Sequence, residues 1–205
     1  MAENKKEKRG FWAEAWDFAK GFLITLAVVL VFVNFVAHPV NVVGRSMEPT
    51  LIDGEYGFTS MITKYFSTPK RGQIVVITME EDENGDGKTE TSHWVKRVIG
   101  LPGDTIESRD DVIYLNGEPL DESAYIDEDW KNQMIEEFGY FNKTIDSENK
   151  AVDFGPVTLG EDEYWVMGDN RPRSKDSRII GPVSRDKIYG TDVMVLYPFN
   201  KMGVR

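Results

Sequence analysis

Residues 21–37 read GFLITLAVVLVFVNFVA, an apolar run broken by only two polar side chains. With the apolar residues just before it, and with Lys20 able to extend its amine towards the headgroups, the run approaches the roughly 20 residues that span a bilayer. A cleaved signal peptide has a similar layout, but its apolar part is usually shorter and no small-residue cleavage site precedes His38-Pro39. We therefore expect an uncleaved transmembrane helix over residues 18–37.

The charges that flank this helix predict its direction across the membrane. Four basic residues lie close to it on the N-terminal side: Lys5, Lys6, Lys8 and Arg9. No lysine or arginine follows it until Arg45. Because basic flanks of membrane helices stay in the cytoplasm, residues 1–17 should be cytoplasmic. Residues 38–205 should form an extracytoplasmic domain, anchored to the cell membrane by a single pass.

The composition excludes several classes of function. The 205 residues carry a formal net charge of -11, with no cysteine and two histidines. Nucleic acid binds basic patches, so an acidic domain argues against such a partner. Without thiols, neither a disulfide framework nor a thiolate metal site can form, and two histidines make a structural zinc site improbable. The composition leaves the oligomeric state open.

After Pro39 the helical period gives way to short apolar or alternating runs separated by Gly, Pro and Asp, which is typical of strands joined by turns. Six runs are expected to be strands: Val40–Val43, Gln73–Met79, His93–Ile99, Val112–Leu115, Tyr164–Met167 and Thr191–Tyr197. Asn116-Gly117 is favoured in type I′ hairpin turns. The external domain is therefore predicted to be mainly β, with antiparallel pairing.

Two polar stretches are interpreted as insertions in this sheet. Residues 80–90 contain Asp82-x-Asn84-x-Asp86-Gly87, which resembles the first half of an EF-hand calcium loop. The bidentate glutamate of such loops is absent, and no flanking helix is expected, so a polar hairpin tip is favoured over a calcium site. The second stretch, about 121–153, is acidic with scattered aromatic residues. We expect it to hold one helix, around Trp130–Phe138.

Ser46 lies a few residues beyond the membrane segment, in Gly44-Arg45-Ser46-Met47-Glu48-Pro49-Thr50-Leu51. At most about 26 Å of extended chain separates it from Pro39, so a nucleophile here would act near the bilayer surface. Serine becomes nucleophilic only when a base takes its proton. His38 sits at the membrane exit, and His93 would point to the opposite strand face from Lys96. A Ser-His-Asp triad is therefore disfavoured.

Lys96 is the other candidate base, within the strand run Trp94-Val95-Lys96-Arg97-Val98-Ile99. A free lysine has a pKa near 10.4 and is almost entirely charged at pH 7. Burial in an apolar site lowers the pKa of an amine, because it disfavours the charged form. From spacing alone, however, a lysine on the solvated face of an edge strand is the simpler interpretation.

Four blocks occur in series behind the apolar segment. They are Gly44–Leu51, Arg71–Val76, Lys96–Asp104 and the run from Met167-Gly168-Asp169-Asn170-Arg171 through Ser174-Lys175-Asp176-Ser177-Arg178. Together they resemble bacterial type I signal peptidases, the membrane-anchored Ser/Lys peptidases that remove signal peptides from exported proteins. The resemblance implies the mainly β, barrel-like fold of that family. It also implies two partners, namely signal peptides of exported pre-proteins and the lipid bilayer.

Carried onto this chain, the resemblance makes Ser46 the nucleophile and Lys96 the general base of an acyl transfer that needs no metal or cofactor. It implies that the Ser174 hydroxyl hydrogen-bonds the lysine amine. Four charged residues would support the site, with the last two forming an ion pair: Asp176, Arg178, Asp169 and Arg97. The Ser46 N–H would stabilise the oxyanion. One branch of the family has a serine where this chain has Gly44, so a second donor is unassigned.

By the same resemblance, an extended substrate would pair with the strands leading to Ser46 and to Lys96. Four residues would then lie near the pockets for small side chains: Met47, Leu51, Trp94 and Val95. Ordinary core packing is the alternative for each of them. Two other functions stay open: a self-cleaving repressor-like peptidase, which would lack an anchor, and a non-enzymatic tethered module that holds calcium at residues 82–86.

Overall fold

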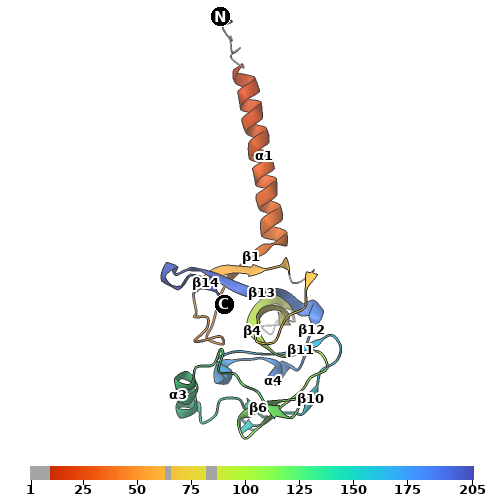
Figure 1. Ribbon diagram of the computed structural model, residues 1–205, viewed down its shortest axis with the longest axis vertical. Coiled ribbons are helices and arrows are strands. Elements are labelled where there is room, and N and C mark those ends of the chain that lie inside the picture. Colours follow the sequence, from red (N-terminus) through yellow and green to blue (C-terminus); the bar gives the residue numbers. More distant parts are fainter. Residues whose placement is uncertain (1–9, 63–65, 82–86) are drawn as a thin grey trace, which may run out of the picture.

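The computed structural model describes residues 10–62, 66–81 and 87–205. It consists of one long N-terminal helix and a body of β-sheets, and the helix projects away from that body (Figure 1). The four basic residues before the helix and the calcium hypothesis for residues 82–86 lie outside the described residues.

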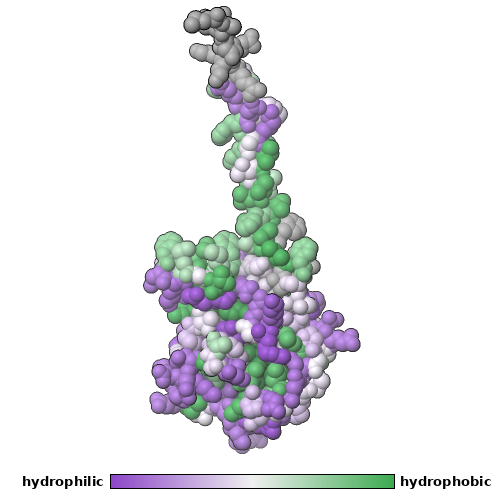
Figure 2. Space-filling view, in the orientation of Figure 1, coloured by the Kyte–Doolittle hydropathy of each residue, from purple (hydrophilic) through white to green (hydrophobic). Residues whose placement is uncertain are grey.

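Helix α1 spans Phe11–Phe35, so it begins seven residues before the expected start at residue 18. An ion pair of 2.9 Å between Asp17 and Lys20, one turn apart, supports this first part of the helix. Its side chains are exposed and apolar over most of its length (Figure 2). Within the described residues, one helix is long and apolar enough to cross a membrane, over Phe11–Val33. The helix ends before residue 37, because Ala37 already pairs in the first strand.

The main sheet is antiparallel throughout and has eight strands among the described residues, in the order β1-β2-β13-β3-β4-β11-β12, with β14 paired to β13. The strands are β1 (Ala37–Asn41), β2 (Tyr56–Ser60), β3 (Ile74–Glu81), β4 (Glu90–Gly100), β11 (Glu163–Met167), β12 (Val183–Ser184), β13 (Ile188–Tyr197) and β14 (Gly203–Val204). β1 lies at the foot of α1 (Figure 1).

A second, smaller sheet lies at the far end of the body from α1 (Figure 1). Its order is β10-β5-β6-β7, with bounds β10 (Val157–Thr158), β5 (Thr105–Arg109), β6 (Val112–Leu115) and β7 (Glu118–Pro119). A two-stranded sheet joins β8 (Thr144–Ile145) to β9 (Ala151–Val152). The body also contains the helices α3 (Glu128–Phe138) and α4 (Ser177–Ile180) and the 3-10 turns η1 (Arg171–Arg173), η2 (Arg185–Lys187) and η3 (Phe199–Lys201).

The prediction of a mainly antiparallel β domain is confirmed, and each of the six expected strands overlaps a strand of the structure. β6 matches its predicted bounds, and the turn after it has positive φ at Asn116 (54°) and Gly117 (87°), as a type I′ turn requires. The expected helix is α3, which begins two residues early because Asp127 caps it by accepting a hydrogen bond of 3.0 Å from the Trp130 N–H.

The sequence analysis missed β2 and β5, whose alternation is weak. β2 depends on Gly57, because a Cβ there would lie 2.1 Å from the Met194 carbonyl oxygen of the neighbouring strand β13. The position of β2 therefore depends on the close approach of its backbone to that of β13, which no apolar alternation in the sequence indicates.

Candidate active site

The turn after β1 and the middle of β4 bring Ser46 and Lys96 together. Lys96 Nζ lies 2.9 Å from Ser46 Oγ. The turn is held against the hydrophobic core, because Met47 and Leu51 are buried in one cluster with Val42. Lys96 is only 4% exposed, although it lies in a strand whose first residues are open to solvent. The solvated-lysine interpretation that spacing favoured is therefore wrong for this residue.

Burial changes the acidity of this lysine. The pKa of Lys96 is lowered from 10.5 to about 8, chiefly because burial disfavours the charged ammonium. Asp176 and Asp169 oppose this change and Arg178 reinforces it. At a pKa near 8, a useful fraction of the amine is neutral at physiological pH, and a neutral amine within hydrogen-bond distance of a hydroxyl can accept its proton.

Asp176 is held by Arg178. The Asp176 carboxylate is buried and accepts hydrogen bonds from Arg178 Nε (2.9 Å) and Nη2 (2.8 Å), and from the Gly168 N–H (3.0 Å). Although burial opposes its charge, Arg178 and these hydrogen bonds keep the pKa of the Asp176 carboxyl below its ordinary value. The carboxylate is thus neutralised by a guanidinium, which limits its ability to raise the lysine pKa.

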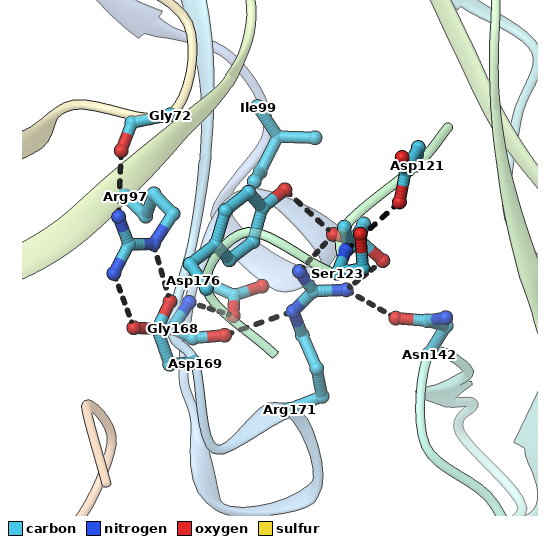
Figure 3. Close-up of polar contacts among 12 residues, drawn as sticks. Gly72, Arg97, Ile99, Asp121, Ser123, Asn142, Gly168, Asp169, Arg171 and Asp176 are labelled. Carbon is cyan, nitrogen blue, oxygen red and sulfur yellow. Dashed lines mark hydrogen bonds and ion pairs between the residues drawn. The ribbon is translucent and has the colours of Figure 1, made fainter. Parts of the chain in front are cut away.

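The predicted ion pair between Arg97 and Asp169 is present. Arg97 Nε and Nη2 donate to the two carboxylate oxygens of Asp169 at 2.7 and 2.6 Å, and Nη1 donates to the Gly72 carbonyl at 2.6 Å (Figure 3). The Thr50 hydroxyl also donates to Asp169, at 2.6 Å. The pair therefore ties the turn that carries Ser46 to the loop after β11.

That loop also contacts the backbone of the nucleophile candidate. The Asn170 N–H donates to the Ser46 carbonyl at 3.0 Å. Gly168 packs so closely here that a Cβ on it would lie 2.3 Å from the Ser46 carbonyl oxygen. The sequence analysis missed Thr50 and Asn170, which lie inside the quoted blocks but carry no local sign of their partners.

The Ser174 hydroxyl does not make the hydrogen bond expected of it. Ser174 Oγ is buried and makes no hydrogen bond to Lys96 Nζ, which donates to Ser46 instead; the Ser174 side chain acts on Asp176, where its hydrogen bond helps to lower the pKa of the carboxyl. The hydroxyl occupies the space beside Gly168, where a Cβ would lie 2.4 Å from Ser174 Oγ.

A cleft of about 300 Å³ opens beside the pair. It is lined by Met47, Trp94 and Val95, as the resemblance implied, but not by Leu51, which is 0% exposed in the core. His93 also reaches the cleft, where its ring stacks on Tyr189 at 4.6 Å. The remaining lining residues are Asn41, Val42, Val43, Gly44, Arg45, Ser46, Lys96, Arg173 and Lys175.

No metal centre accompanies this site in the described ranges 10–62, 66–81 and 87–205, which contain no group of three or more His, Cys, Asp or Glu side chains able to hold an ion. A buried amine beside a hydroxyl at a cleft is an arrangement suited to nucleophilic catalysis by serine.

Comparisons with known proteins also point to a peptidase. The family described as signal peptidase, peptidase S26, matches residues 15–197. A signal peptidase I from Bacillus amyloliquefaciens is 40% identical over 201 residues, covering 98% of this chain and 97% of its own. Signal peptidase I S from Bacillus subtilis strain 168 is 38% identical over 202 residues, covering 98% and 97%. A crystal structure of a signal peptidase I from Enterococcus faecalis V583 covers 60% of this chain and 96% of its own, with 31% identity and a TM-score of 0.39. Because the sequence matches extend over nearly the whole chain, the chain belongs to the signal peptidase family, peptidase S26.

Proposed function

We propose that this chain is a membrane-anchored serine endopeptidase that cleaves N-terminal signal peptides from exported pre-proteins, with Ser46 as nucleophile and Lys96 as general base. Family membership supports the activity. The roles of the two residues depend on one observation: a lysine amine that is buried, and whose pKa is lowered to about 8, lies 2.9 Å from a serine hydroxyl.

The reaction is an acyl transfer in two steps. Neutral Lys96 takes the hydroxyl proton as Ser46 Oγ bonds to the scissile carbonyl carbon, and the ammonium then gives that proton to the leaving amine. A water molecule then gives a proton to the same amine as its oxygen bonds to the acyl carbon, and the ammonium returns that proton to Ser46 Oγ as the ester bond breaks. Neither of the two steps needs a metal ion or an organic cofactor.

The negative oxygen of each tetrahedral intermediate needs donors that are already in place. Within the described residues, the Ser46 N–H donates no hydrogen bond, so it is available for this oxygen. The Gly44 N–H is not, because it donates to Asp53 Oδ1 at 2.8 Å. Ser46 therefore supplies both the nucleophile and one oxyanion donor.

The cleft supports a substrate bound as an extended strand. Residues 41–43 and 93–95, from the segments that precede Ser46 and Lys96, are among those that line it. An edge-to-edge peptide would take main-chain hydrogen bonds from such segments and place alternate side chains in pockets. Met47, Trp94 and Val95 would contact the small residues before the cleavage site.

Helix α1 is proposed to cross the cell membrane with residues 1–17 in the cytoplasm and residues 38–205 outside. Its length and apolar surface support the membrane location, and the basic residues before it support the direction. Only nine residues lie between Val36 and Ser46, which keeps the cleft close to the bilayer that holds a signal peptide.

The test is a precursor-processing assay with the full chain in detergent or vesicles. Ser46→Ala and Lys96→Ala should each lower the rate by at least about 1,000-fold, because each removes a partner of the proton transfer. Ser147→Ala and Lys70→Ala change the same residue types at exposed positions and should process normally. Full activity in either of the first two variants would contradict the assignment.

A further inference from the structure

Residues 121–143, the first part of the stretch of about 121–153 that was predicted from sequence to be an insertion, take no part in the mechanism above. We name residues 121–143 the clamp segment. It contains α3 and has a small core of its own around Ile126, Met134 and Phe141. Its polar side chains do not all face solvent, because several contact the loop 168–178 that follows β11. Three arginines of that loop make these contacts: Arg171, Arg173 and Arg178.

Arg171 is the most deeply held of the three, at 1% exposure. Its Nε donates to the Gly168 carbonyl at 2.9 Å, and its Nη1 donates to Glu122 at 3.1 Å. Nη1 also donates to the Asn142 side-chain oxygen, and Nη2 donates to the other Glu122 oxygen (Figure 3). Every nitrogen of this buried guanidinium is therefore paired, and two of its three partners come from the clamp segment.

The other two arginines extend the contact along the loop. Arg178 Nη1 donates to the Lys143 carbonyl at 2.9 Å while its Nη2 holds Asp176. Arg173 pairs with Glu137 of α3 and also lines the catalytic cleft. The clamp segment thus contacts the loop at three positions, residues 171, 173 and 178.

The clamp segment is itself fixed to the second sheet. The Asp111 carboxylate, in the turn between β5 and β6, accepts hydrogen bonds from the backbone N–H groups of Phe141 (2.8 Å), Asn142 (2.6 Å) and Lys143 (3.1 Å). Asn142 Nδ2 also donates to the Asp111 carbonyl at 2.9 Å. Asn142 therefore approaches Arg171 from a rigid support.

The loop that is held in this way contacts the nucleophile directly. Gly168, whose carbonyl Arg171 holds, packs against the Ser46 carbonyl, and Asn170 donates to that carbonyl at 3.0 Å. Asp176, which accepts from the Gly168 N–H, is among the charges that act on Lys96. A displacement of Arg171 would therefore move both the serine and the surroundings of the lysine.

We propose that Glu122 and Asn142 are positioning residues for the cleavage reaction, which they serve by holding Arg171 and so fixing loop 168–178 against Ser46 and Lys96. The inference depends on the proposed function, because it assigns the clamp segment a part in that same reaction. It gives residues 121–143 a defined task. Through Arg171 they hold loop 168–178 in the position from which it contacts Ser46 and acts on Lys96.

The experiment compares Glu122→Ala and Glu122→Gln with the unsubstituted full chain in detergent micelles, using a peptide with a small-residue cleavage site. For Glu122→Ala we expect kcat to fall by about 10- to 100-fold with KM within about twofold, since a misplaced catalytic group lowers kcat far more than binding. We also expect the acid limb of kcat/KM to move to higher pH, because water that reaches Lys96 restores its ordinary pKa. Glu122→Gln keeps the shape and one acceptor oxygen, so its changes should be smaller and in the same direction.

Glu136→Ala is the matched control, because Glu136 lies on the exposed face of α3; its kcat and pH profile should be unchanged. Thermal unfolding identifies variants that lose only stability, since a purely structural role lowers the melting temperature and leaves the pH profile in place. If Glu122→Ala does not fold, Glu122→Gln decides by the same criteria. Folded Glu122 variants with the kcat and pH profile of the control would overturn the positioning role. Activity in Ser46→Ala would overturn the proposed function itself.

Discussion

Lys96 and Arg97 are adjacent basic residues in strand β4, but their side chains have different surroundings. Side chains of neighbouring strand residues point to opposite faces. On one face, the Arg97 guanidinium takes both oxygens of Asp169 and stays in a complete ion pair. On the other, the Lys96 amine meets a hydroxyl and buried surface, so its charge is disfavoured. The alternation of β4 therefore pairs the Asp169 carboxylate with Arg97, so that Asp169 raises the pKa of Lys96 less than Asp176 does.

This separation predicts the pH dependence of the reaction. The base must be neutral to act, and the pKa of Lys96 is about 8. About one molecule in ten then has a neutral lysine at pH 7, and about nine in ten at pH 9. We expect kcat/KM for a signal-peptide substrate to rise through pH 8 and level off above it. Steady-state kinetics from pH 6 to about 10 measure this, and a profile that falls between pH 7 and 9 would refute a lysine base.

At the scale of elements, the site is the junction of a turn and a loop. The turn after β1 supplies Ser46, and the loop between β11 and α4 supplies Asp169 and Asp176. They approach so closely that only glycine fits at position 168. The nearest atom to such a Cβ is the backbone carbonyl oxygen of Ser46, at 2.3 Å, and a backbone atom cannot turn aside as the end of a flexible side chain can.

Gly168→Ala tests this contact. The new Cβ would lie 2.3 Å from the Ser46 carbonyl oxygen and 2.7 Å from Ser174 Cβ, so the two segments must separate. We expect a loss of about 1–3 kcal/mol in stability, the usual cost of overpacking, and a fall in kcat of at least about 10-fold. In the control Gly160→Ala, the Cβ meets only the Glu163 side chain, at 3.3 Å, and activity should persist. Denaturant unfolding and steady-state kinetics provide both readings.

At the scale of the whole molecule, the anchor and the cleft are joined by a short connection. β1 begins directly after α1 (Figure 1), and Ser46 lies in the turn that follows β1. The second sheet and the clamp segment lie on the far side of the body. The proposed enzyme thus presents its nucleophile towards the membrane and its structural support away from it.

The proposed orientation predicts a protease-protection result. In intact spheroplasts, a protease added outside should remove a tag at the C-terminus and leave an N-terminal tag intact, because residues 38–205 would be outside and residues 1–17 inside. Exchanging the four basic residues before the helix for glutamate should reduce the fraction of chains in this orientation. Protection of the C-terminal tag in unsubstituted chains would reverse the assignment.

Local pattern sufficed for features whose cause is local. The apolar run 21–37 predicted a helix with an exposed apolar surface, and alternation predicted strands such as β4 and β6, since period and turn chemistry act within a few residues. The sequence also supplied Ser46 and Lys96 as candidates. It could not place β2, which depends on the close approach of Gly57 to β13.

Only the tertiary structure determined the surroundings of the candidate site residues. Burial of Lys96, its 2.9 Å contact with Ser46, the exclusion of Leu51 from the cleft and the lack of a hydrogen bond between Ser174 and Lys96 all depend on segments distant in sequence. Desolvation and hydrogen bonding are set by whatever surrounds a group in space. Here the surroundings of β4 come from the first turn and from a loop some 70 residues later, so the chemistry of the lysine was determined by folding and not by its neighbours in the chain.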